Sequence, residues 1–144
     1  MSTLKSPFKK RRSTAVRWLT GWGPLWLCTG LVFKGSVLPP SQIPQFLHRF
    51  NDKLIHGVEF FLLFFSAVNA FRLAKSAVFR HAGVTAFAYS ILIGILTEVS
   101  QHFVEGRQPD VYDLFADTVG ISAGMVLYGV IRYWNYTNFR RALS

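Results

Sequence analysis

Acidic and histidine side chains recur at helical spacing in separate stretches of this chain, and such side chains can transfer protons or hold a cation. Asp52 and His56 are four residues apart, so they share one face of a helix, and Glu59 follows one turn later. Glu98 and Gln101 share a face in a second stretch. Both stretches are otherwise apolar, which makes these polar groups candidates for a functional site.

A third stretch carries Asp110, Asp113 and Asp117 at spacings of three and four residues, which again places them along one helix face. Asp110 follows a proline and is a candidate helix cap. The same face continues with Gly120 and Gly124, a pair of small residues that lets a neighbouring helix approach closely. These acids are therefore expected to point toward protein and away from lipid.

The residue types suit acid and base chemistry on a charged substrate. We assign the general acid and base roles to His56, Glu98 and Asp113, with Asp52 behind the imidazole. Arg107 is expected to hold a phosphate or a carboxylate. The binding residues predicted from the sequence are Asp52, Lys53, Gln101, Arg107 and Asp117.

The acids outnumber the bases expected near them. Arg107 is the nearest candidate partner, and His56 can supply a second cation or a proton. At least one carboxylate should therefore be protonated, hydrated or bound to a cation. A divalent cation held by His56, Glu98, Asp113 and Asp117 stays open as a cofactor, although the tight His or Cys spacing of strong metal motifs is absent.

Membrane helices are the elements that must position these groups. A chain of 144 residues that is 51% hydrophobic and contains 14 Phe is too apolar for an ordinary soluble domain. Its apolar blocks approach the roughly 20 residues needed to cross a bilayer. The predicted fold class is all-α, a four-helix transmembrane bundle with helices at about 16–33, 53–72, 83–103 and 111–133.

A single helical domain, residues 18–133, is expected between a basic leader, residues 1–17, and a basic tail, residues 134–144. The first apolar block contains Pro24 and has no small-residue cleavage site after it, so we interpret it as an uncleaved membrane helix with a kink near the proline.

The basic residues predict an orientation. Twelve of the 16 Lys and Arg residues lie in the leader, in the loop between the second and third helices, and at the C-terminal end. This asymmetry predicts cytoplasmic termini and places all seven acids in the outer half. The basic residues that give the net charge of +9 flank apolar blocks and do not line a soluble face, so nucleic-acid binding is not expected.

The spacing of the polar residues also carries a resemblance. An Asp-Lys-x-x-His motif is followed by a Glu-x-x-Gln motif, an Arg, an Asp six residues later and a Gly seven residues after that. Here these positions are Asp52, Lys53, His56, Glu98, Gln101, Arg107, Asp113 and Gly120. Over residues 50–125 the chain thus resembles the VanZ-like family of small bacterial membrane proteins.

The resemblance implies a multi-pass protein of the bacterial cytoplasmic (inner) membrane with a polar site at the outer face. The family is named for a member associated with resistance to teicoplanin, and the resemblance implies no reaction. Asp117 stands where the family usually has Asn. We expect Asp117, if it lies deeper than Asp113, to act much as Asn does.

Three functions fit the sequence. The first is an envelope enzyme that acts on a lipid-linked or glycopeptide-related component, and the second is a protein that binds such a component without catalysis. The third is a structural module in which the polar network locks helix packing. Membrane lipid is the expected partner in each case, and no pattern in the sequence indicates an oligomeric state.

Overall fold

The computed structural model describes residues 14–42, 51–74 and 81–142, and all regular secondary structure within these ranges is helical. The elements in chain order are α1 (Thr14–Val37), the 3-10 helix η1 (Pro40–Gln42), α2 (Asp52–Ala74), α3 (Ala82–Gln101) and α4 (Val111–Arg141). The structure therefore confirms the all-α class and the four helices.

Each helix overlaps the block predicted for it, and the ends differ most in α1 and α4. Helix α1 continues past residue 33 to Val37, with Pro24 inside it. Helix α4 reaches Arg141 because residues 134–141 contain no Gly or Pro that would end a helix. Most of the predicted tail is thus helical, whereas residues 1–13 of the predicted leader lie outside the described residues.

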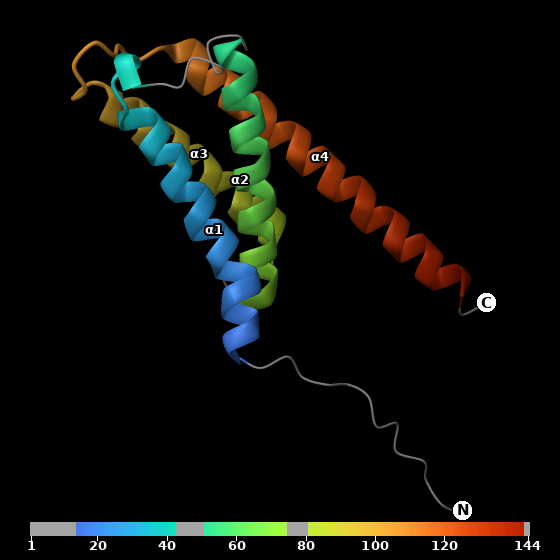
Figure 1. The fold of residues 1–144 in the computed structure, drawn as a ribbon. Helices are drawn as coiled ribbons and strands as arrows, with labels where there is room; N and C mark the ends of the chain where they lie inside the picture. The colour runs from blue at the N-terminus through green and yellow to red at the C-terminus, as the bar shows by residue number, and fades with distance from the viewer. Residues whose placement is uncertain (1–13, 43–50, 75–80, 143–144) are drawn as a thin grey trace, which may run out of the picture.

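The helices form a bundle in which α2 lies between α1 and α4 (Figure 1). The C-terminal ends of α1 and α3 and the N-terminal ends of α2 and α4 meet at one end of the bundle, at the top of Figure 1. We call this the polar end. Helix α4 diverges from the other helices toward its C-terminus.

The core is built around the middle of α2. Phe60, Leu63 and Phe64 are fully buried there, and Leu25 of α1 and Ile121 of α4 pack into the same cluster. Polar contacts add to this packing. The Cys28 Sγ lies 3.2 Å from the Ser66 Oγ, and the Thr29 hydroxyl lies 2.8 Å from the Tyr89 hydroxyl. Such hydrogen bonds between helices are common inside membranes.

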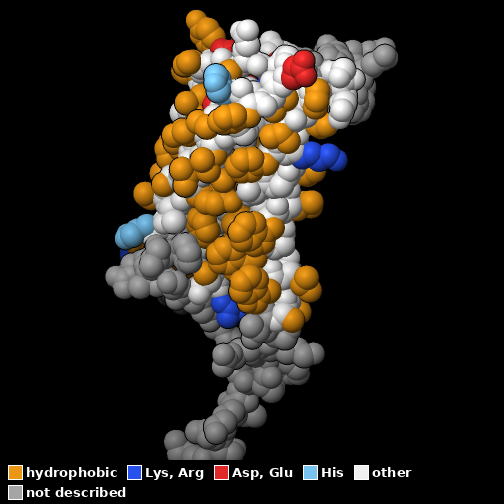
Figure 2. Space-filling view, turned by 90° about the vertical axis from the view of Figure 1, so that its left-hand side faces the viewer, with side chains coloured by type: hydrophobic (Ala, Val, Ile, Leu, Met, Phe, Trp, Pro, Cys, Tyr) orange, Lys and Arg blue, Asp and Glu red, His pale blue; other side chains and the backbone are white. Residues whose placement is uncertain are grey.

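Three of these helices, α2, α3 and α4, are long and apolar enough to cross a membrane. Helix α1 has 24 residues, with Pro24 inside it, and is not among the three. Its crossing of the membrane stays a prediction. Figure 2 shows a broad hydrophobic flank with the visible Asp and Glu side chains gathered at the polar end.

Candidate functional site

The polar residues from three helices converge at the polar end. Asp52 and Lys53 begin α2, Glu98 lies near the end of α3, and Asp113 is in the first turn of α4. The structure thus brings His56 and Asp113 together, although 57 positions separate them. The catalytic and binding roles that we assigned to them stay predictions.

A close helix crossing sets the distance between α2 and α4 at this end. A Cβ added to Gly120 would overlap the carbonyl oxygen of Gly57 and lie 2.8 Å from its carbonyl carbon. A Cβ on Gly124 would lie 2.8 Å from the ring of Phe64. The predicted small-residue face is therefore the surface that α4 presents to α2, and it brings the acids of α4 against the start of α2.

Lys53 is the basic partner of two acids of α4. Its Nζ lies 2.5 Å from the Asp110 Oδ2 and also pairs with the Asp113 Oδ1. The Lys53 ammonium, by donating to Asp110, lowers the pKa of that carboxyl below its ordinary value. Asp110 also caps α4, since its side chain accepts a hydrogen bond from the Tyr112 amide, as predicted.

His56 lies between two carboxylates of α4. Its Nδ1 is 2.9 Å from the Asp117 Oδ1, and its Nε2 is 3.7 Å from the Asp113 Oδ2. Both carboxylates are buried, and Asp117 is only 1% exposed. An ionised Asp117 only accepts hydrogen bonds, and in that state His56 donates to it from Nδ1. In the neutral imidazole, Nε2 is then the nitrogen with a free lone pair.

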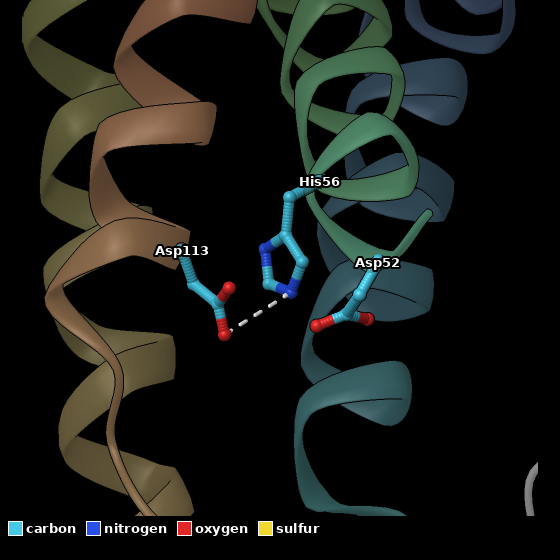
Figure 3. Close-up of side chains that lie close together, drawn as sticks. All are labelled: Asp52, His56 and Asp113. Atoms are coloured by element: carbon cyan, nitrogen blue, oxygen red, sulfur yellow. Dashed lines mark ion pairs between the residues drawn. The ribbon is translucent and has the colours of Figure 1, made fainter. Parts of the chain in front are cut away.

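Asp52 completes a cluster around that nitrogen. Ligand atoms of Asp52, His56 and Asp113 all lie within 4.8 Å of one another. Figure 3 shows the carboxylates of Asp52 and Asp113 on either side of the imidazole, from α2 and α4 respectively. The sequence had grouped His56 and Asp113 with Glu98 and Asp117 as metal ligands, so Asp52 replaces those two in the cluster that the structure assembles.

Glu98 and Gln101 have other neighbours. The Glu98 Oε2 accepts a hydrogen bond of 2.9 Å from the backbone amide of Asp110, which ties the end of α3 to the start of α4. Gln101 is 2% exposed. The Glu98 Oε1 and the Gln101 Nε2 are buried and have no hydrogen-bond partner among the described residues.

Arg107 points away from the acids that we expected it to neutralise. Its guanidinium donates to the carbonyl oxygens of Leu38 and Gly35 at 3.1 and 2.9 Å, so it satisfies free carbonyls at the C-terminal end of α1. Within the part of the chain that is described, it forms no ion pair. Lys53 takes the neutralising role instead, although the sequence placed Lys53 only among the binding residues.

An open hollow of about 370 Å³ lies beside this cluster, lined by Glu98, Val99, His102, Phe103 and Pro109. The hollow does not include His56 or Asp113. It is therefore a neighbouring surface feature, and the chemically richest group of side chains is the one around His56.

The comparisons with known proteins bear on these same residues. The sequence model of the VanZ/LLP1 family matches residues 6–132, which include every residue of the cluster. Neither curated proteins nor solved structures give a match. The family match covers most of the chain and agrees with the resemblance of its motifs, and the chain therefore belongs to the VanZ/LLP1 family.

Proposed function

We propose that this membrane protein lies in the bacterial cytoplasmic membrane with its polar end outward, and that it binds there the polar head of a lipid-linked envelope component. The observation that carries the proposal is the gathering of buried charged side chains at one end of an apolar bundle. Asp113 and Asp117 are buried there, beside the partly buried Lys53 and His56.

The cost of burying charge supports a ligand. An ionised carboxylate near bilayer depth costs about 3 kcal/mol unless it is paired or solvated. Lys53 and His56 offset part of this cost, but the Asp117 Oδ2, the Glu98 Oε1 and the Gln101 Nε2 have no partner in the described residues. A bound polar head at this end of the bundle would offset part of the cost that these buried, unpartnered atoms leave.

The orientation rests on the distribution of basic residues. Gln42 follows α1 at the polar end, and α4 ends at Arg141 at the opposite end (Figure 1). Reporter fusions at Gln42 and at Ser144 should therefore report opposite sides of the membrane, with Ser144 inside. A reporter at Ser144 that is active outside would overturn the proposed orientation.

Lipid binding can be measured directly. Native mass spectrometry of the purified protein, reconstituted with lipids of its host membrane, should detect a lipid adduct that Asp113→Asn loses. Glu105→Gln is the matched control, because Glu105 is an exposed acid at the same end. Equal adducts on all three proteins would contradict the proposal.

A structural role is the second candidate, and one observation favours it. Arg107 and Glu98 use their polar atoms to tie α1, α3 and α4 together. If that role is sufficient, Asp113→Asn should lower the unfolding midpoint in lipid-free detergent as much as it lowers it with lipid. A binding role instead predicts that wild type gains stability from lipid and that the variant does not.

A further inference from the structure

We infer that Asp52, His56 and Asp113 bind a divalent transition-metal ion at the polar end. The inference does not depend on the proposed lipid binding, because it concerns the ion alone. Two carboxylates and one imidazole are borderline donors of the kind that Zn²⁺ and Mn²⁺ accept, whereas Mg²⁺ prefers oxygen ligands throughout.

The spacing of the three side chains fits one ion. Zinc lies about 2.0 to 2.2 Å from nitrogen and carboxylate oxygen ligands, so two ligands of a tetrahedral ion stand roughly 3.3 to 3.6 Å apart. The His56 Nε2 and the Asp113 Oδ2 are 3.7 Å apart. An oxygen of the exposed Asp52 carboxylate is within 4.8 Å of ligand atoms of both residues, across the imidazole from Asp113 (Figure 3).

Asp117 orients His56 for metal binding. A histidine that binds a metal usually donates its other ring N–H to a carboxylate, which fixes the tautomer and makes the ligating nitrogen more basic. The Asp117 Oδ1 receives that hydrogen bond at 2.9 Å, and Asp117 is 1% exposed. Its Oδ2 has no hydrogen-bond partner among the described residues. A buried carboxylate with a spare oxygen is stabilised by a cation on the far side of the imidazole.

Lys53 orients the Asp113 carboxylate in a similar way. Its ammonium pairs with the Asp113 Oδ1, which leaves the Oδ2 directed at His56. The contact between Gly57 and Gly120 fixes the two helices that carry these groups. Ligands held on rigid helices and supported by neighbouring hydrogen bonds are the arrangement that metal sites need.

The charge balance also favours an ion. Four carboxylates, of Asp52, Asp110, Asp113 and Asp117, surround the neutral imidazole and face a single Lys53 ammonium, so the ionised cluster stays negative and attracts a divalent cation. Three protein ligands leave at least one coordination position open, as in catalytic zinc sites. Since Asp52 is exposed and the other two ligands are not, the open position is reached from the Asp52 side.

The test is a metal titration of the full chain, purified in detergent without a polyhistidine tag and stripped with EDTA. Bound Zn²⁺ is counted by mass spectrometry of the eluted protein, and its Kd is measured against a chromophoric chelator. We expect one Zn²⁺ per chain. Asp117→Ala should weaken binding about 10- to 100-fold, as supporting residues do elsewhere, and His56→Gln and Asp113→Asn should weaken it more.

Two further variants make the test decisive. Asp52→Asn changes an exposed residue, so its weaker Zn²⁺ binding would not follow from misfolding, and circular dichroism checks all variants. His102→Gln removes an exposed histidine at the same end and should leave the Kd unchanged. The inference is overturned if wild type binds no stoichiometric Zn²⁺, or if Zn²⁺ binding survives His56→Gln and Asp113→Asn.

Discussion

The two halves of α4 carry similar apolar side chains but have different surroundings. In residues 111–124, Asp113, Ala116, Asp117, Gly120, Ile121 and Gly124 are buried at spacings of three and four residues. In residues 125–141 no residue is buried, and large side chains such as Val126 and Trp134 are more than half exposed. The helix is continuous, so its secondary structure does not cause the difference.

The difference in burial between the two halves follows from the lipid that surrounds a membrane helix. Lipid chains are as apolar as Val or Leu, so apolar side chains alone give little drive for two helices to associate. Small residues and polar pairs give that drive, and α4 places them against α2 in its first half, where Gly57 meets Gly120 and His56 meets Asp117. The site therefore lies where the helices are held together most firmly.

Breaking the contact between Gly57 and Gly120 should lower the stability of the protein the most. Gly120→Ala places a methyl group on the carbonyl of Gly57, which is backbone and cannot turn away, so the two helices must separate. We expect the free energy of unfolding, measured by SDS titration in mixed micelles, to fall by about 3 kcal/mol.

Gly129→Ala is the control on the same helix, because a Cβ there meets nothing within 4 Å. It should be neutral or slightly stabilising, by about 0.5 to 1 kcal/mol, since alanine favours a helix. Equal losses in the two variants would mean that the crossing does not depend on close approach.

The second prediction concerns the polar pair of the first half. Asp117→Ala leaves the His56 Nδ1 without its acceptor and should lower the free energy of unfolding by about 2 kcal/mol. Asp117→Asn keeps an acceptor oxygen and should lower it by less than about 1 kcal/mol. The same SDS titration compares them, and an Asn variant as unstable as the Ala variant would show that the charge of Asp117 is needed.

The sequence predicted the helix faces of the acids because the period of an α-helix is fixed. Asp113 and Asp117, four residues apart, must share a face whatever surrounds them. The partners of these acids were harder to predict. That Lys53 meets Asp113 and that His56 meets Asp117 depends on how α2 is rotated against α4, and this is set by the contact of Gly57 with Gly120.

Arg107 was predicted less well because it lies in a connection. Its neighbour Gly106 has a φ of 79°, a conformation that glycine adopts easily, and the turn there directs the Arg107 side chain to α1. Arg107 is close in sequence to the acids of α4, but that closeness does not indicate which way its side chain points. The free carbonyls at the end of α1 were a possible signal, but the sequence predicted that α1 ends at residue 33.

This cap on α1 leads to the third prediction. Arg107→Gln should lower the free energy of unfolding by about 1 kcal/mol, because the carbonyls of Gly35 and Leu38 lose a charged donor. Arg140→Gln, at the exposed end of α4, should have no effect on the same measurement. If Arg107→Gln weakens lipid binding without changing stability, Arg107 holds a ligand, as the sequence first indicated.

The smallest change in stability is expected for substitutions in the second half of α4. Val126→Ala and Ile131→Ala truncate exposed side chains, so each should change the free energy of unfolding by no more than about 0.5 kcal/mol. Light scattering of the eluted protein should give the same mass for both variants and wild type. If either variant instead loses as much stability as Asp117→Ala and also falls to a lower mass, then the second half of α4 packs against another copy of the chain. The glycine contact and the polar pairs of the first half would in that case not be required for helix association in this protein, because the exposed apolar face of the second half would hold two copies together.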